Sequence, residues 1–236
     1  MALFAIADLH LALSNPEKSM EVFGKGWTDY IPRLEESFRE KVSPQDTVLM
    51  PGDISWATYM KQAEEDFKFI DSLPGKKIIG RGNHDYWWTT VKKMEETLAS
   101  MGTTTISLIN HNTIRTEGYV ITGTRGWKLP NEESFNAEDR KIYDREKIRI
   151  GLAVEALRKE DPDHELKRVL MLHYPPLTTR VPDTELTEII AAADIDICIY
   201  GHLHGKAHKK AFEGVKGGTE YKCVAADFLG FTPAEI

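Results

Sequence analysis

The chain has 236 residues, of which 41% are hydrophobic and 28% are charged, and its net charge is −7. This length and apolar fraction fit a single α/β domain spanning residues 1–236 better than two domains. The negative charge argues against a nucleic-acid or anionic-membrane partner, because such partners need a basic surface.

Short apolar runs alternate with longer amphipathic segments, which is the pattern of α/β units. In chain order, strands are predicted at 3–7, 47–50, 77–80, 119–123, 169–172 and 195–200. Helices are predicted at 27–42, 58–72, 87–101, 138–160 and 183–193. The segment 206–228 differs, because two strand-like runs flank the glycine-rich turn 214–218. It predicts a hairpin and an antiparallel part of a sheet.

Features that would place the chain in a membrane or an oxidising compartment are missing from the sequence. No apolar run reaches the roughly 18 residues of a membrane span, and the N-terminus lacks the basic start of a signal peptide. Cys198 lies in an apolar run and, with Cys223, implies no disulfide framework. We therefore expect a cytoplasmic protein, with its oligomeric state left open.

Polar side chains follow five of the predicted strands. They are Asp8 and His10, then Asp53, then Asn83, His84 and Asp85, then His173, and last His202 and His204. In open α/β sheets, ligands bind beyond the carboxyl ends of the strands, so these five loops are expected to converge. The chain has eight histidines, and five of them lie in these loops, which chance does not explain.

Each of these short motifs is weak by itself. The pair Asp8 and His10 also fits a turn with a surface histidine, and Gly52-Asp53 also fits a simple turn. His173 alone fits a half-buried histidine with satisfied hydrogen bonds. Their conjunction, in order and each after a strand, favours a site.

The residue types indicate metal chemistry at phosphorus. Mixed carboxylate and imidazole ligands suit Mn, Fe, Zn or Co rather than Ca, and the lack of a cysteine argues against structural zinc. Two ions about 3.5–4 Å apart need a bridging group, which a carboxylate provides with its two oxygens. Such a pair generates hydroxide near neutral pH and holds the oxygens of an in-line displacement at phosphorus. A phosphate ester is therefore the natural substrate.

The same residues resemble the calcineurin-like metallophosphoesterase superfamily. Its pattern Asp-x-His, Gly-Asp, Gly-Asn-His-Asp/Glu, His and Gly-His-x-His is matched in order between residues 8 and 204. The resemblance implies a four-layered α/β/β/α sandwich with two mixed β-sheets and a metal site at one edge. It also implies a phosphohydrolase that holds two divalent metal ions.

The resemblance also implies a role for each matched residue. The ligands of the first ion would be Asp8, His10 and His204, those of the second Asn83, His173 and His202, and the bridging ligand Asp53. His84 would face the substrate, stabilise the phosphoryl charge and protonate the leaving oxygen, and Asp85 would orient His84 by a hydrogen bond. A metal-bridging hydroxide would attack phosphorus opposite the leaving group.

Several other side chains are candidates for a substrate pocket. Tyr86, Trp87 and Trp88 follow the catalytic loop and, like Trp56, are candidates to wall the pocket. For two of these three residues, anchoring of the following helix to the core is an account at least as good. Arg125, after the strand 119–123, is a candidate to bind phosphate, and Trp127 lies near it.

Other charged segments have simpler interpretations. The segment 131–149 is irregular at its start and is a candidate insertion over the site. Its charged part, 138–149, is most simply a solvated helix face, and this interpretation is favoured over a substrate role for Arg140 or Arg145. His111, His164 and His208 are expected at the surface.

Three functions compete at this point. The first is a phosphohydrolase acting on small phosphate mono- or diesters; the second is a nuclease with the same two-metal chemistry, which the acidic balance disfavours. The third is a non-catalytic scaffold on the same fold, which the intact set of polar residues disfavours. The Ser/Thr protein phosphatase branch carries Asp-Arg-Gly after its Gly-Asp, whereas Ile54-Ser55-Trp56 stands here, so that assignment is disfavoured too.

Overall fold

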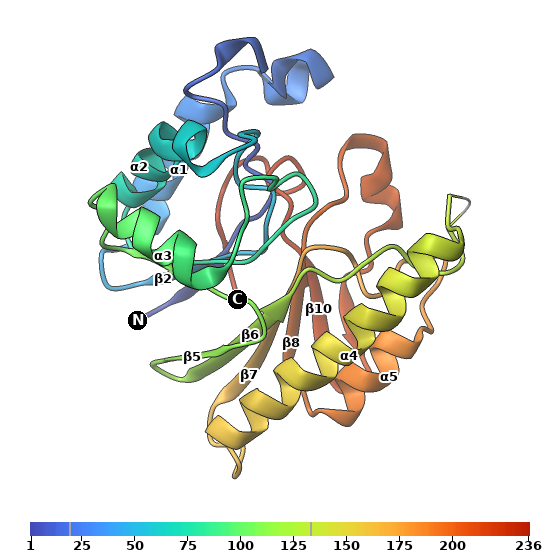
Figure 1. The fold of residues 1–236 in the computed structure, drawn as a ribbon. Coiled ribbons are helices and arrows are strands. Elements are labelled where there is room, and N and C mark those ends of the chain that lie inside the picture. Colours follow the sequence, from blue (N-terminus) through green and yellow to red (C-terminus); the bar gives the residue numbers. More distant parts are fainter. Residues whose placement is uncertain (19, 133) are drawn as a thin grey trace.

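The computed structural model describes residues 1–18, 20–132 and 134–236, and their strands form two mixed β-sheets (Figure 1). The first sheet has the order β11-β1-β2-β3-β4. Its strands are β1 (Leu3–Ala5), β2 (Thr47–Met50), β3 (Lys76–Ile79), β4 (Ile106–Leu108) and β11 (Ala234–Glu235). The first four run parallel to one another, and β11 pairs antiparallel with β1 at the sheet edge.

The second sheet has the order β5-β6-β7-β8-β10-β9. Its strands are β5 (Thr113–Thr116), β6 (Tyr119–Thr124), β7 (Lys167–Leu172), β8 (Ile197–Tyr200), β9 (Gly214–Lys216) and β10 (Thr219–Cys223). The four central strands are parallel, and the edge strands β5 and β9 are antiparallel to their neighbours. The predicted hairpin is thereby confirmed as β9 and β10, but its first strand lies inside the segment 214–218 that was expected to be the turn, and residues 205–210 form a 3-10 helix instead of a strand.

Helices cover the outer face of each sheet (Figure 1). The helices α1 (Tyr30–Lys41), α2 (Glu64–Ser72) and α3 (Val91–Ser100) lie over the first sheet, and α4 (Ala137–Glu160) and α5 (Glu185–Ala192) lie over the second. Short 3-10 helices are η1 (Pro16–Lys18), η2 (Met20–Phe23), η3 (Lys25–Trp27), η4 (Met60–Ala63) and η5 (Gly205–Lys210). Among the described residues, every helix is too short or too polar to span a bilayer.

The strands alternate their side chains between two apolar layers. In β7, Val169 and Met171 point to the layer between the two sheets, and Leu170 and Leu172 point to the layer under α4 and α5. A side-chain period of two is what a strand buried on both faces requires. A third layer lies between the first sheet and its helices. The predicted α/β/β/α sandwich is therefore confirmed.

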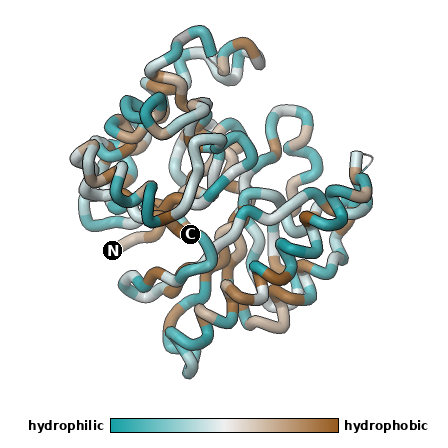
Figure 2. Tube along the Cα trace, in the orientation of Figure 1, coloured by the Kyte–Doolittle hydropathy of each residue, from teal (hydrophilic) through white to brown (hydrophobic). Residues whose placement is uncertain are grey.

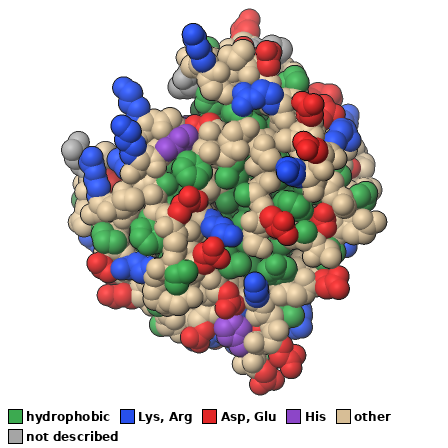
Figure 3. Space-filling model, turned by 180° about the vertical axis from the view of Figure 1, so that it is seen from behind, with side chains coloured by type: hydrophobic (Ala, Val, Ile, Leu, Met, Phe, Trp, Pro, Cys, Tyr) green, Lys and Arg blue, Asp and Glu red, His purple; other side chains and the backbone are tan. Residues whose placement is uncertain are grey.

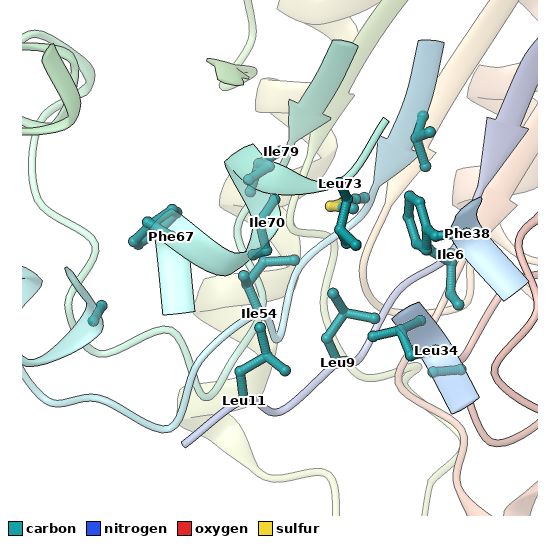
Figure 4. Packing of buried hydrophobic residues seen from close by; sticks show 14 of the residues in the cluster. Ile6, Leu9, Leu11, Leu34, Phe38, Ile54, Phe67, Ile70, Leu73 and Ile79 are labelled. Atoms are coloured by element: carbon teal, nitrogen blue, oxygen red, sulfur yellow. The ribbon is translucent and has the colours of Figure 1, made fainter. Parts of the chain in front are cut away.

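The helices contribute apolar stripes to these layers. Figure 4 shows Phe67 and Ile70 of α2 near Ile79 at the end of β3, and Leu34 and Phe38 of α1 near Leu9 and Ile6. Along α4 and α5 the colouring by hydropathy alternates between brown and teal (Figure 2), as expected of helices with one face on a sheet and one in water.

The predicted elements differ from the observed ones where tertiary packing overrides local pattern. The helix predicted at 87–101 begins only at Val91, because Thr90 caps it and Trp87 and Trp88 are buried in the preceding turn. The strands β4, β5 and β11 were not predicted, since each is only two to four residues long and lacks a clear apolar run.

Candidate metal centre

The polar loops that follow the carboxyl ends of the strands in both sheets meet at one place. Asp8 and His10 follow β1, Asp53 follows β2, and Asn83 and His84 follow β3, all from the first sheet. From the second sheet, the contributing residues are His173 after β7 and His202 and His204 after β8. The sheets are joined beside this point, because the Ala7 N–H donates to Val224 O at 2.7 Å and the Ala226 N–H donates to Ala7 O at 2.9 Å.

The loop backbones are strained where they present these side chains. Asp8, His10, Asp53 and His202 have φ between 45° and 70°, and they are four of the nine non-glycine residues with positive φ in the described part of the chain. Such conformations cost energy and persist where the surrounding structure imposes them, often at functional sites. Glycine is needed at position 82, because a Cβ there would clash with the Asp53 carboxylate.

Asp8, His10 and His204 form a first group of donors. One ligand atom from each lies within 4.8 Å of the others. The two imidazole nitrogens His10 Nε2 and His204 Nε2 are 3.2 Å apart, and His204 Nε2 lies 3.4 Å from Asp8 Oδ1. The backbone N–H of His202 donates to Asp8 Oδ2 at 2.9 Å and fixes the carboxylate. This arrangement can hold a cation at the point that the nitrogens and the oxygen face.

A second group surrounds His173. Its Nδ1 donates to Pro51 O at 3.1 Å, which leaves a lone pair on Nε2. That nitrogen faces Asn83 Oδ1 at 2.7 Å, Asp53 Oδ2 at 3.4 Å and His202 Nδ1 at 3.3 Å. The lone pairs of acceptors at these distances repel one another, and a cation that lies among them removes this repulsion. The residues therefore fit a bound metal ion.

Asp53 lies between the two groups. Its Oδ2 is 3.7 Å from His10 Nε2 and 3.4 Å from His173 Nε2. Its Oδ1 accepts the backbone N–H of His84 at 2.7 Å. A single oxygen of Asp53, Oδ2, thus faces both groups. This differs from the expected bridge, in which both oxygens of the carboxylate take part. Asp8 is also shared, since a ligand atom of its carboxylate lies within 4.8 Å of ligand atoms of Asp53 and His173 as well as of those of His10 and His204.

The centre is buried, and in the described structure its carboxylates have no partner with a permanent positive charge. Asp8, Asp53 and Asp85 are each at most 1% exposed, and among the described residues no Lys or Arg pairs with them. Burial, together with the carboxylates of Asp85 and Asp8, raises the pKa of Asp53 well above its usual range. A group of buried carboxylates is costly without a compensating cation, so the site favours positive ions.

Three of the histidines are neutral, as metal ligands must be. Burial lowers the pKa values of His10, His173 and His202 to about 3 each. His204 is different: burial lowers its pKa, but the hydrogen bonds with Asp227 and Asp8 outweigh this and raise it to about 10. A metal ion bound there would therefore displace a proton from His204.

His84 lies beside the donor groups without joining them. Its ring packs 4.5 Å from the Trp56 ring and 5.6 Å from the His10 ring, and its side chain is half-buried. In the described part of the chain, its buried Nδ1 has no hydrogen-bond partner. Because the side chain is only half-buried, part of it is open to a group that enters the site.

The predicted hydrogen bond from Asp85 to His84 is wrong. Asp85 Oδ2 instead accepts the N–H groups of Gly82 at 2.7 Å and Asp53 at 2.8 Å, and Oδ1 accepts the N–H of Ile54 at 2.8 Å. The carboxylate satisfies backbone donors of two tight turns that would otherwise be buried without partners. Asp85 thus fixes the loop that carries Asp53, and it acts on that loop rather than on His84.

One site residue, Asp227, was missed from the sequence. Its Oδ1 lies 2.9 Å from His204 Nδ1, and its Oδ2 lies 3.1 Å from His208 Nε2. It therefore orients His204 so that Nε2 points to Asp8. The signal was present, because Asp227 follows the strand-like run at 219–223 just as the other site residues follow their strands. His208, expected to stand alone at the surface, is part of this group.

Aromatic rings surround the donor groups. Trp56 stacks on His10 at 4.9 Å, and Tyr174 lies 4.1 Å from the His202 ring. Tyr86 is 61% exposed and meets His84 edge-on at 6.1 Å, so it remains a pocket candidate. Trp87 is 1% exposed and packs on Phe67, so its anchoring role in the core is the one observed.

The remaining candidates divide into near and remote positions. The Arg125 guanidinium lies 4.4 Å over the Trp127 ring, and the Arg125 carbonyl accepts the N–H of His173 at 3.1 Å, which places the residue beside the centre. Arg140 stacks over Phe135 at 5.2 Å, in keeping with a solvated helix face. His164 is exposed, as expected, and lies 2.9 Å from Asp196.

Comparisons with known proteins agree with this geometry. The model of the calcineurin-like phosphoesterase family matches residues 1–206. No curated protein sequence matches the chain. Solved structures with a similar fold include phosphopantetheinyl hydrolase from Mycobacterium tuberculosis, at 15% identity and a TM-score of 0.55, covering 100% of this chain and 95% of that one.

Two further solved structures share the fold at low identity. One is a protein of unknown function, AQ665 from Aquifex aeolicus, at 17% identity and a TM-score of 0.52, covering 99% of this chain and 95% of that one. The other is TT1561 from Thermus thermophilus, at 10% identity and a TM-score of 0.53, covering 93% of this chain and 86% of that one. Likeness at this level of identity speaks for the fold alone.

Proposed function

Because the chain belongs to the calcineurin-like phosphoesterase family, we propose that it is a hydrolase of small phosphate mono- or diesters that works with two divalent metal ions, of Mn, Fe, Zn or Co. One observation carries this proposal. Buried carboxylates and neutral imidazoles from both sheets face one another with no Lys or Arg among the described residues to balance them.

Seven side chains would hold the two ions. Those nearest the first ion are Asp8, His10 and His204, those nearest the second are Asn83, His173 and His202, and Asp53 lies between them. Bound together, the ions would make a water molecule nucleophilic near neutral pH and neutralise charge on the phosphate.

The chain's own residues then prepare the reaction. The half-buried ring of His84 lies beside the donor groups, 5.6 Å from the ring of His10. We assign to it the stabilisation of the phosphoryl charge and the protonation of the leaving oxygen, because proton transfer needs a free imidazole within reach. Asp85 holds the turn that positions Asp53 and so acts as a positioning residue.

The test is turnover of a panel of phosphate esters by protein loaded with Mn²⁺. The panel contains a chromogenic monoester, the matching diester, a nucleic-acid strand and, because one protein of the same fold is a phosphopantetheinyl hydrolase, a phosphopantetheinyl ester. Turnover of a small ester that chelation abolishes supports the proposal. Turnover of the strand alone indicates the nuclease, and no turnover of any member indicates a scaffold.

Substitution of His84 tests the division of roles. His84→Ala should lower kcat by about 100- to 10,000-fold, as expected for loss of a general acid, while the protein keeps its metal content. Asp53→Asn should instead weaken metal binding itself, because it removes the charge between the two groups. Metal analysis of both variants decides the matter: a His84→Ala protein that has lost its metal contradicts the assignment.

A further inference from the structure

A cleft opens beside the metal centre on the side of the second sheet. Its volume is about 450 Å³, within the range of roughly 300–1,000 Å³ typical of small-molecule sites. It is formed by the loops that follow β6, β7 and β8, which are the loops expected to carry ligand contacts in such sheets. His202 lines it, so the cleft reaches one of the side chains of the proposed metal site.

The cleft has an apolar part and a cationic part. Pro175 and Leu203 contribute apolar surface, and Arg180 and Lys210 contribute two positive charges. In the described regions of the chain, neither cation forms an ion pair. The acidic lining residue, Glu132, accepts the Leu129 N–H at 3.0 Å.

The positive charge here runs against the balance of the whole molecule, which is −7. The η5 loop alone carries three lysines, Lys206, Lys209 and Lys210. Figure 3 shows Lys and Arg side chains gathered at the edge where this loop projects. A local basic surface on an acidic protein concentrates anions at that point.

Backbone hydrogen bonds hold the two cationic loops together. The N–H of Thr179 donates to Lys210 O, and the pairs between Thr178 and Val181 close a tight turn around Arg180, with N to O distances of 3.0–3.1 Å. The hydroxyl of Thr179 adds a bond to Lys209 O at 3.1 Å. The two cations therefore extend from fixed backbone positions, which lowers the entropy cost of binding a ligand between them.

We propose that this cleft binds the alcohol part of the ester and that Arg180 and Lys210 bind a second phosphate on that alcohol. The inference rests on the proposed phosphohydrolase function. Water adds to the phosphorus at the metal centre, the bond from phosphorus to the alcohol oxygen breaks, and the alcohol takes a proton and leaves with its second phosphate. A guanidinium fork and an ammonium group suit phosphate, and a concave cleft suits a small molecule.

Two matched esters test the proposal: hexanediol bisphosphate and hexyl phosphate, which differ in the second phosphate. The measured quantity is the ratio of their kcat/KM values with Mn²⁺-loaded protein. The double variant Arg180→Ala/Lys210→Ala should lower this ratio about 10- to 100-fold through KM, as expected for lost charge-assisted hydrogen bonds. Arg180→Lys should lower it less. Lys209→Ala, on the same loop but outside the cleft lining, should leave the ratio unchanged.

Two results would overturn the inference: an unchanged ratio in the double variant, and an equal fall of the ratio in Lys209→Ala. Failure of the proposed function looks different, because the wild-type protein then turns over neither ester. In that event calorimetric binding of hexanediol bisphosphate and hexyl phosphate to the wild-type and double-variant proteins still decides whether the cleft recognises a second phosphate.

Discussion

At the scale of single residues, the centre depends on carboxylates that support other site residues. Asp85 satisfies backbone donors of the loops that carry Asp53, and Asp227 holds the ring of His204. Partners of this kind fix the tautomer and the orientation of a metal ligand, and they increase its basicity. Removal of one such carboxylate should therefore weaken metal binding without abolishing it.

Asp227→Asn tests this at His204. We expect metal affinity to fall by about 10- to 100-fold, because an uncharged amide oxygen accepts the Nδ1–H of His204 more weakly than a carboxylate and increases the basicity of Nε2 less. The affinity is measured by competition with a chelator of known strength. Asp196→Asn is the matched control, since Asp196 pairs with the exposed His164 at 2.9 Å, and it should leave the metal affinity unchanged. Equal losses in the two variants would show that Asp227 has no special role.

At the scale of elements, the strand ends are held in register by side chains that bind backbone. Asp46 precedes β2, and its carboxylate accepts the N–H of Ala2 at 2.7 Å and the N–H of Ser43 at 2.8 Å. These bonds tie the start of β1 to the loop before β2, and they lower the pKa of Asp46. The first sheet therefore enters the site with its strands aligned.

The lowered pKa gives a prediction with a definite sign. Because the folded state binds the Asp46 proton less tightly than the unfolded state, its stabilising contribution is present above the unfolded pKa and is lost as pH falls through the folded pKa. Asp46→Asn should be less stable by about 1–2 kcal/mol at neutral pH. The difference should shrink once pH drops below about 4. Urea unfolding of both proteins at the two pH values measures it, and a gap of constant size would refute the assignment.

Particular residues explain what the sequence could and could not predict. The site is predictable because buried β-branched runs such as 47–50 are easy to recognise, and in α/β sheets their carboxyl ends share one edge. The apolar period also predicts a helix through Trp87 and Trp88, but the core requires both residues in a turn. The partner of Asp85 was not predictable, since it depends on how closely the turns after β2 and β3 approach each other.

At the scale of the whole molecule, the centre lies where the two sheets meet. The first sheet supplies Asp8, Asp53 and Asn83, and the second supplies His173, His202 and His204. The fold therefore explains the donor geometry, because the parallel strands of both sheets end at a common edge. Metal ions bound there would link the sheets and stabilise the folded state by mass action.

The most direct test of this account is a calorimetric titration of the metal-free wild-type protein with Mn²⁺, followed as heat per added equivalent. The account predicts binding of two equivalents for each chain, accompanied by release of protons because His204 must lose its proton to become a ligand. Binding of a single equivalent, or of none, would contradict the claim that the strand ends of both sheets build a two-metal centre.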